Sequence, residues 1–175
     1  MASSVQLQLR RGAAADLTGF TGAQGEPIYD ETGRRLLMMD GQTAGGIPVN
    51  GVYAPNGSFL QPNVLEGAVE TLSVGGTTYS TVLQIPAGCL LVGVSLRVIS
   101  AITGCTAFEL GTAATPNLFA TGLATAAGSS KAALIAPAVF TAATPLLLTS
   151  TAGGNFTGGT IRAALHFFTI GAPTS

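Results

Sequence analysis

The region 76–171 reads as a succession of short strands, and this pattern constrains the fold more than any other feature of the chain. Apolar and polar residues alternate there with the period of two that a half-buried strand shows. Gly, Ser and Thr occur between the alternating runs, as they do in turns. We predict strands over 79–85, 89–99, 106–110, 145–149 and 160–168. Short strands at regular spacing predict an all-β fold, an antiparallel β-sandwich of the jelly-roll-like kind.

The alternation also predicts which face of each strand is buried. In 89–99 the apolar face begins at Leu90 and continues through every second residue to Val98, which places Cys89 on the less apolar face. Cys105 is expected on the less apolar face of its own strand. The expected hairpin register does not bring the two cysteines opposite each other, so we expect two free thiols.

Composition excludes several classes of protein. Hydrophobic residues make up 47% of the chain, which is too apolar for intrinsic disorder. A net charge of −1 provides no basic excess for nucleic acid. No apolar run approaches the ~20 residues of a membrane span, and residues 1–12 lack the apolar centre of a secretory signal. We therefore expect no nucleic-acid partner, no membrane partner, and synthesis in a cytoplasm.

Charge is scarce in this chain. Only 9% of the residues are charged, against about 25% in an ordinary globular protein. A surface so poor in charge is either built of Thr, Ser, Asn, Gln and Gly or buried in permanent subunit contacts. We expect a stable homo-oligomer; the alternative is a compact Thr- and Gly-rich β-domain that acts alone.

The charges are concentrated at the N-terminal end. Residues 1–50 hold nine of the fifteen, 51–75 hold two, and 76–175 hold four. A break of this size predicts two units with different environments. We expect an N-terminal module over 1–50, a linker over 51–75 and a sandwich over 76–171.

The N-terminal module is expected to consist of short strands and turns. Residues 5–10 alternate as a strand does. The segments 26–30 and 34–39 flank a hairpin turn in which Gly33 is expected to take a positive φ. Two further turns are expected, at 40–41 and 45–46.

The linker is expected to contain one short helix. Pro62 and Asn63 suit a helix start, and Leu65, Ala68 and Leu72 recur at spacings of three and four. Such a segment would connect the two units without joining either.

The chain lacks the residue constellations of the common enzyme classes. Its one histidine, His166, lies within an expected strand and is interpreted as structural. No nucleophile elbow, P-loop or dinucleotide fingerprint is present. A metal site needs clustered ligands and a glycosidase needs two carboxylates, whereas 76–171 contains Glu109 as its one acid. We therefore predict no enzymatic activity, no cofactor and no metal.

An ordered set of short motifs runs through the N-terminal module: L-R-R-G, then G-E near a turn, then R-L and D-G. The motifs lie at 7–12, 25–27, 29–30, 34–36, 40–41 and 45–46. Over about residues 5–49 the chain resembles the N-terminal module of many phage tail fibres, tropism determinants and head fibres. The resemblance implies a trimeric β-prism that ties a fibre to the virion.

The second unit carries a resemblance of its own. It is similar to the C-terminal domain of fibre and head-spike proteins from phages and gene transfer agents of α-proteobacteria. The residues that carry it lie at 85–87, 92–94, 97–98, 102–106, 110–111, 145–149, 153–159, 161–162 and 165–167. The resemblance implies a sandwich displayed on a virion.

Together these observations predict a structural phage virion protein on the capsid exterior: a head fibre, spike or decoration protein made in the host bacterial cytoplasm. It would dock through 1–50 onto the major capsid protein or another virion protein. We expect a homotrimer, with a pentamer as the main alternative. Charged pairs set register and specificity, so the proposed attachment residues are Arg10, Arg11, Glu26, Asp30, Arg34, Arg35 and Asp40.

Two other functions remain open at this point. The chain could be a short tail fibre or receptor-binding protein that contacts host surface glycans. It could also be a polysaccharide-cleaving spike, although the shortage of paired carboxylates argues against that reading. Copy number per virion separates head from tail.

Overall fold

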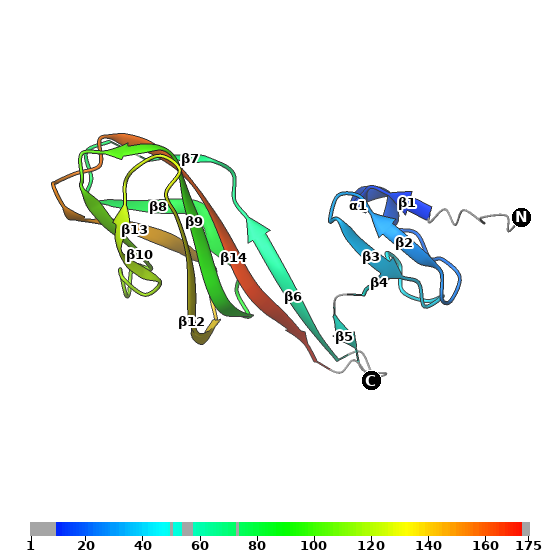
Figure 1. The fold of residues 1–175 in the computed structure, drawn as a ribbon. Helices are drawn as coiled ribbons and strands as arrows, with labels where there is room; N and C mark the ends of the chain where they lie inside the picture. Colours follow the sequence, from blue (N-terminus) through cyan, green and yellow to red (C-terminus); the bar gives the residue numbers. More distant parts are fainter. Residues whose placement is uncertain (1–9, 50, 54–57, 73, 173–175) are drawn as a thin grey trace, which may run out of the picture. The chain divides into compact units, whose positions relative to one another are not determined.

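The chain forms two units, Met1–Pro55 and Asn56–Ser175. The computed structural model describes residues 10–49, 51–53, 58–72 and 74–172. Each unit has its own apolar core. Nearly all the regular structure is β-strand, which confirms the predicted all-β class (Figure 1). The strand expected over 5–10 lies, apart from Arg10, outside the described residues.

The first unit is built on a small sheet in the order β1-β2-β3-β4. Its elements are β1 (Arg10–Gly12), α1 (Ala14–Leu17), β2 (Pro27–Asp30), β3 (Arg35–Met38), β4 (Ile47–Pro48) and β5 (Val52–Tyr53). β1 runs parallel to β2, whereas β2, β3 and β4 pair antiparallel. Leu17, Ile28, Leu37 and Met39 are buried together, with Phe20 packed against them. So few buried side chains make a small core, and polar contacts must contribute to holding this unit together.

The predicted hairpin is confirmed, because Asp30 at the end of β2 pairs with Arg35 at the start of β3. The turn between them differs from the prediction. Arg34 has the positive φ, 49°, and Gly33 does not. Gly33 is needed for space instead: a Cβ there would lie 2.5 Å from Oδ2 of Asp30, closer than such atoms approach.

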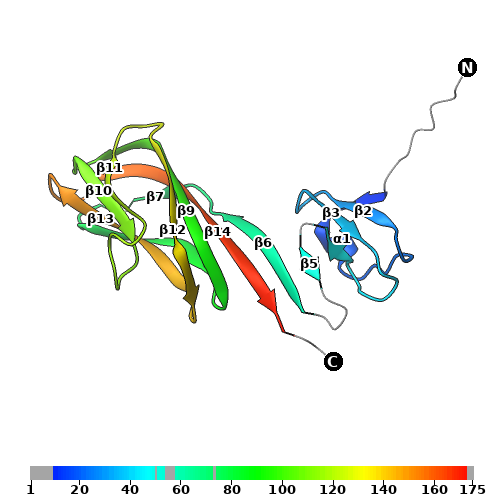
Figure 2. The same cartoon turned by 60° about the horizontal axis from the view of Figure 1, so that its bottom comes forward.

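The second unit consists of two packed antiparallel sheets. Its strands are β6 (Phe59–Glu66), β7 (Glu70–Thr71), β8 (Thr78–Ile85), β9 (Cys89–Thr103), β10 (Ala107–Gly111), β11 (Ala120–Ala124), β12 (Ser130–Phe140), β13 (Thr144–Ala152) and β14 (Gly158–Gly171). One sheet has the order β11-β10-β13-β8; the other contains β12-β9-β14-β6, with β7 beside β14 (Figure 2). The chain changes sheet after nearly every strand, and β6 and β14 are neighbours. This is the topology of a jelly roll.

The core lies between the two sheets. Its largest fully buried side chains include Phe108, Leu110, Leu146, Leu148, Phe156 and Leu165. The inward face predicted for the last strand is confirmed, since Ile161, Ala163, Leu165 and Phe167 are at most 8% exposed. The opposite side of β14 is therefore left facing away from the core.

The buried face predicted for β9 is wrong at the start of the strand. Cys89 and Leu91 are buried, whereas Leu90 and Val92 are only partly so; from Val94 onward the predicted face is correct. The pairing of β9 with β14 skips one residue at Val92. A bulge of this kind moves every preceding side chain to the other face.

Both cysteines consequently lie in the core rather than on the less apolar faces. Cys89 is 0% and Cys105 7% exposed, and both are free thiols in the structure. Burial raises the pKa of each thiol above its ordinary value. Because the thiolate is the reactive form, neither cysteine is poised for chemistry at neutral pH.

Much of the segment expected as a linker consists of β6 and β7, which belong to the same sheet as β9 and β14. β6 pairs with β14 along its whole length, from Glu66 opposite Ala164 to Phe59 opposite Gly171. The short helix predicted over 62–72 is therefore wrong. A weak helical spacing cannot nucleate a helix of two turns by itself, whereas eight residues of strand pairing satisfy the backbone.

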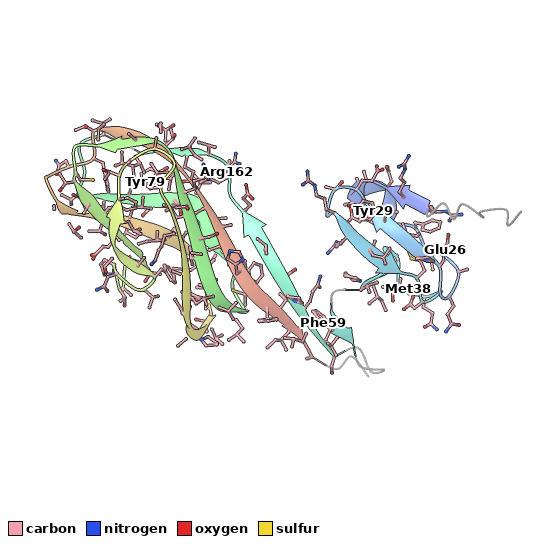
Figure 3. The ribbon with its side chains drawn as sticks, viewed as in Figure 1. Glu26, Tyr29, Met38, Phe59, Tyr79 and Arg162 are labelled. Atoms are coloured by element: carbon pink, nitrogen blue, oxygen red, sulfur yellow. The ribbon has the colours of Figure 1, made fainter. Side chains whose placement is uncertain are left out.

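Glu70 connects the two sheets at this end of the jelly roll. Its carboxylate accepts hydrogen bonds from the backbone N–H of Val82 (2.8 Å) and Leu83 (3.1 Å) on β8. The hydroxyl of Tyr79, labelled in Figure 3, donates to the same carboxylate at 3.0 Å. A charged acceptor with three donors stabilises more than neutral pairs do.

Besides β6 and β7, two further strands of the second unit are not predicted by the sequence pattern, β11 and β12. β12 is an edge strand whose register with β9 shifts between Leu134 and Ala138, around Pro137. Leu134 is 90% exposed, so the strand shows no clean alternation. Proline is tolerated at such edges and bulges because its missing N–H is not needed there. β11 is short and contains Gly122 at a φ of 63°.

Candidate attachment site

Asp30 is the buried centre of the charged residues in the first unit. It is 1% exposed. One carboxylate oxygen accepts hydrogen bonds from the N–H groups of Thr32 (3.1 Å) and Gly33 (2.9 Å), and the other accepts from Nε of Arg35 (3.1 Å). Burial alone would raise the pKa of Asp30, but these bonds and the charge of Arg35 outweigh it and lower the pKa. Asp30 therefore builds the hairpin turn and is not open to a partner.

Arg10 and Glu26 form an ion pair over the rim of the same core. Nη1 of Arg10 lies 3.2 Å from Oε1 of Glu26, which is labelled in Figure 3. The guanidinium also lies 4.9 Å from the centre of the Phe20 ring, within the range of a cation–π contact. Glu26 accepts a further hydrogen bond from the N–H of Ala23 at 3.1 Å. The pair closes the edge of the unit, with more than half of the Arg10 side chain exposed.

Asp40 organises the turn that follows β3. It accepts hydrogen bonds from the N–H groups of Gln42 (2.9 Å) and Thr43 (2.7 Å) and from the Thr43 hydroxyl (2.6 Å). The Thr43 hydroxyl and these N–H groups lower the pKa of Asp40 to about 2. The turns expected at 40–41 and 45–46 are both present, and all their glycines have positive φ.

Arg11 and Arg34 are the predicted site residues most open to solvent. The Arg11 side chain is 75% exposed, with its Nε 3.5 Å from Oε1 of Glu31. Arg34 is exposed at the hairpin turn and makes no ion pair within the described residues. Exposed pairs contribute only about 0–1 kcal/mol, so both arginines can contact a partner without unfolding the module.

The structure adds an apolar surface that the sequence interpretation did not single out. Tyr29 and Met38 are 39% and 38% exposed on β2 and β3, on the sheet face opposite the core (Figure 3). Leu36 pairs with Tyr29 and Ile47 pairs with Met38 on that face. We call these four residues the outer face of the module. The uninterrupted apolar run at 36–39 is the sequence signal for it, since both faces of that strand then carry apolar side chains.

A hollow of about 250 Å³ opens beside the ion pair of Asp30 and Arg35. Asp30, Arg35 and Leu37 line it from the hairpin, and Gly45 and Gly46 line it from the turn before β4. The Arg35 side chain is 41% exposed. Arg35 can therefore hold Asp30 and still present donors to a bound group.

The second unit shows no catalytic arrangement around the residues considered from the sequence. Nε2 of His166 lies 3.1 Å from Oγ of Ser95, which fits the structural role predicted for it. Within the described ranges, no three His, Cys, Asp or Glu side chains gather as a metal site would require. No helix in the described part of the chain is long and apolar enough to cross a membrane. The absence of enzymatic activity stays a prediction.

Comparison with known proteins supports the N-terminal resemblance. Residues 7–43 match the family model of the major tropism determinant N-terminal domain. This match confirms the resemblance drawn from the motifs of the module, and it supports a structural component of a phage virion. Among curated proteins, none matches the chain.

Two solved phage capsids contain chains that overlap with this fold. A chain of the cyanophage Pam1 capsid asymmetric unit is 19% identical, with a TM-score of 0.49, over 63% of this chain and 86% of that one. A chain of the acidic stable capsid of Helicobacter pylori bacteriophage KHP30 is 17% identical, with a TM-score of 0.44, over 65% and 98% respectively. At these scores the two likenesses carry no functional argument.

Proposed function

We propose that this chain is a capsid-exterior protein of a phage, a head fibre, spike or decoration protein, that docks through its first unit and displays its jelly roll. The observation that carries the proposal is the match of residues 7–43 to a tropism-determinant N-terminal domain. The matched segment contains β1, β2 and β3 of the small sheet and all four of its buried core residues, so it lies within the first unit and not in the sandwich.

The surface of the first unit supports a docking role. Its outer face leaves Tyr29 and Met38 exposed and Leu36 partly exposed. Arg11 is next to Tyr29 in the pairing of β1 with β2 and is largely exposed. An apolar centre with an arginine beside it is the composition of a protein–protein contact. Asp30 and Asp40, by contrast, are occupied by their own turns.

The outer face also supports self-association. A small sheet with four buried core residues removes little apolar surface from water by itself, and contact between copies would cover its second apolar face. We propose a homotrimer assembled through the first unit. Static light scattering tests this directly: a trimeric mass supports it, a pentameric mass replaces it with the vertex-spike arrangement, and a monomer at micromolar concentration contradicts it.

Docking is tested with particles that lack this protein. Purified full-length chain is added to them, and the bound fraction is measured by sedimentation. Met38→Asp places a charge in the middle of the outer face, and we expect it to weaken binding at least about tenfold, or ~1.4 kcal/mol. Val82→Asp is the matched control, because Val82 is 82% exposed on β8 of the jelly roll.

Circular dichroism and thermal melts verify that both variants remain folded. If Val82→Asp abolishes binding and Met38→Asp does not, the jelly roll docks and the proposed orientation is reversed. If both bind as the unaltered chain does, neither surface is the docking site.

A second function has one specific observation in its favour. The matched family is named for a tropism determinant, which favours a short tail-fibre or receptor-binding protein that contacts host surface glycans. Quantitative mass spectrometry of purified virions separates the two. A copy number comparable with that of the capsid subunits supports decoration, whereas a few copies per particle support a tail position.

A further inference from the structure

A hollow of about 520 Å³ lies on the outer surface of the sheet formed by β12, β9, β14 and β6. A cavity of this volume is of the size that holds a small ligand. It lies in the second unit alone, and nothing in the proposed docking role uses it. In Figures 1 and 2 the strands β12, β9, β14 and β6 run side by side.

Strand register explains why the sheet is hollowed at this place. Ala132 pairs with Ser95, Ser95 with Ala164, and Ala164 with Glu66, so one row across four strands consists mainly of small side chains. These residues line the hollow. The adjacent row on this face contains Arg97 and Arg162, whose long side chains form the wall of the hollow.

That adjacent row places two arginines directly opposite each other. Arg97 of β9 pairs with Arg162 of β14, and Ser130 of β12 pairs with Arg97. Like charges in directly opposite positions destabilise a sheet. Arg162, labelled in Figure 3, is compensated by Glu66, with 3.2 Å between Nη1 and Oε1. Arg97 has no acidic partner within the described residues.

Every lysine and arginine of the second unit lines this hollow. Between residue 56 and the C-terminus the sequence contains three basic residues, Arg97, Lys131 and Arg162, and all three line this one hollow. Lys131 pairs with the core residue Leu96, so it belongs to the opposite face of the sheet, and it also lines a neighbouring hollow. The proposed site therefore depends on the two arginines. In a chain with 9% charged residues, two arginines placed directly opposite each other on an outer sheet face, one of them without an acidic partner among the described residues, point to a ligand.

We propose that this groove binds an oxyanion, a carboxylate or phosphate group carried by a sugar-sized molecule. The guanidinium groups of Arg97 and Arg162 provide planar, paired donors that suit both anions. The hydroxyls of Ser95 and Ser130 can hydrogen-bond the remainder of the ligand. Glu66 and Arg162 are 60% and 46% exposed, and a pair so open yields readily to a competing anion. This proposal does not rest on the docking role of the first unit.

Amide chemical shifts of the full-length protein, recorded by NMR, test the proposal. Sodium glucuronate, inorganic phosphate and, as the neutral control, glucose are titrated at constant ionic strength set with sodium chloride. We expect saturable shifts at 95–97, 130–132 and 162–164 with glucuronate, phosphate or both, and none with glucose. Tighter binding of glucuronate identifies an acidic sugar, and tighter binding of phosphate identifies a phosphorylated one. No saturable shift with either anion overturns the proposal.

Two variants with opposite expected effects separate binding from misfolding. Arg97→Gln should weaken anion binding at least about fivefold, and it should leave the melting temperature in chloride unchanged or higher because it removes the like-charge contact. Glu66→Gln removes the internal competitor for Arg162 and should strengthen binding several-fold. Equal affinities for all three proteins, or weaker binding in both variants, would show that the arginines do not form the site.

Discussion

The two units of this chain differ in how much they depend on charge. In the first unit, a carboxylate is buried inside the hairpin turn, and ion pairs close the rim of a core of four buried side chains. In the jelly roll, more than twenty buried apolar residues form the core; Glu70 joins its two sheets, while Arg97 and Arg162 lie on the outer surface of one of them. A small unit cannot bury enough apolar area, so it relies more on charged hydrogen bonds, whereas the jelly roll relies mainly on its apolar core.

The comparison predicts the largest mutational effect in the apolar core of the jelly roll. Leu148→Ala, on β13, deletes a fully buried side chain. We expect it to lower the free energy of unfolding of the second unit by about 2–5 kcal/mol, measured by urea denaturation. Leu134→Ala is the matched control, because Leu134 is 90% exposed on β12 and its loss should change stability by less than about 0.5 kcal/mol. Equal effects would mean that the sandwich core is not where the structure places it.

The variant of the first unit that we compare with Leu148→Ala removes a charge rather than apolar side-chain atoms. Asp30→Asn keeps the size of the side chain but loses the charged acceptor that serves Thr32, Gly33 and Arg35. We expect the first unit to lose about 1.5–3 kcal/mol, the range for a hydrogen bond to a charged group, while the melt of the jelly roll is unchanged. Glu31→Gln, next in the sequence and exposed, is the control. A stable Asp30→Asn module would show that charge is not what holds this unit.

The same contrast predicts that the two units lose stability at opposite ends of the pH scale. The pKa of Asp40 falls to about 2 in the folded chain, from 3.8, and that of Asp30 is also lowered. A carboxyl with a lowered pKa stabilises the fold above about pH 3.8, and this contribution is lost as the pH falls toward 2.

In the jelly roll the shifts have the other sign. Burial raises the pKa of Tyr79, and its hydrogen bond to Glu70 raises it further; burial also raises the pKa of Cys89 and Cys105. Their contribution is present below the ordinary values of 10.0 and 9.0 and is lost as the pH rises above them. Methyl spectra recorded by NMR from pH 2 to 11 should lose the folded-state signals of 10–49 first in acid and those of 74–172 first in alkali. Simultaneous loss at either end would contradict this difference.

The sequence predicts the strands that are regularly half-buried and fails where regularity ends. The alternation at 160–168 identifies β14 and its buried face correctly. It places the start of β9 on the wrong face, because the bulge at Val92 is set by pairing with β14, about seventy residues later. It omits β12, whose exposed Leu134 and central Pro137 remove the alternation. Edge strands depend on their partners more than on their own residues.

The two candidate sites also differ in how far the sequence predicts them. The charged motifs of the first unit are visible in the sequence because they lie within one hairpin and its flanks, although the structure shows that Asp30 and Asp40 serve their turns. The basic groove is not visible, since Arg97 and Arg162 are more than sixty residues apart in the sequence and only the register of β9 and β14 places them opposite each other.

A cryo-electron microscopy map of particles that carry this protein would show directly which unit docks. We expect residues 10–49 to lie against the particle, with the outer face of Tyr29, Leu36, Met38 and Ile47 covered by a virion protein or by other copies of the chain. We expect the jelly roll to project outward with its basic groove open. A map in which the jelly roll contacts the shell and residues 10–49 project into solvent would show that the proposed orientation is wrong.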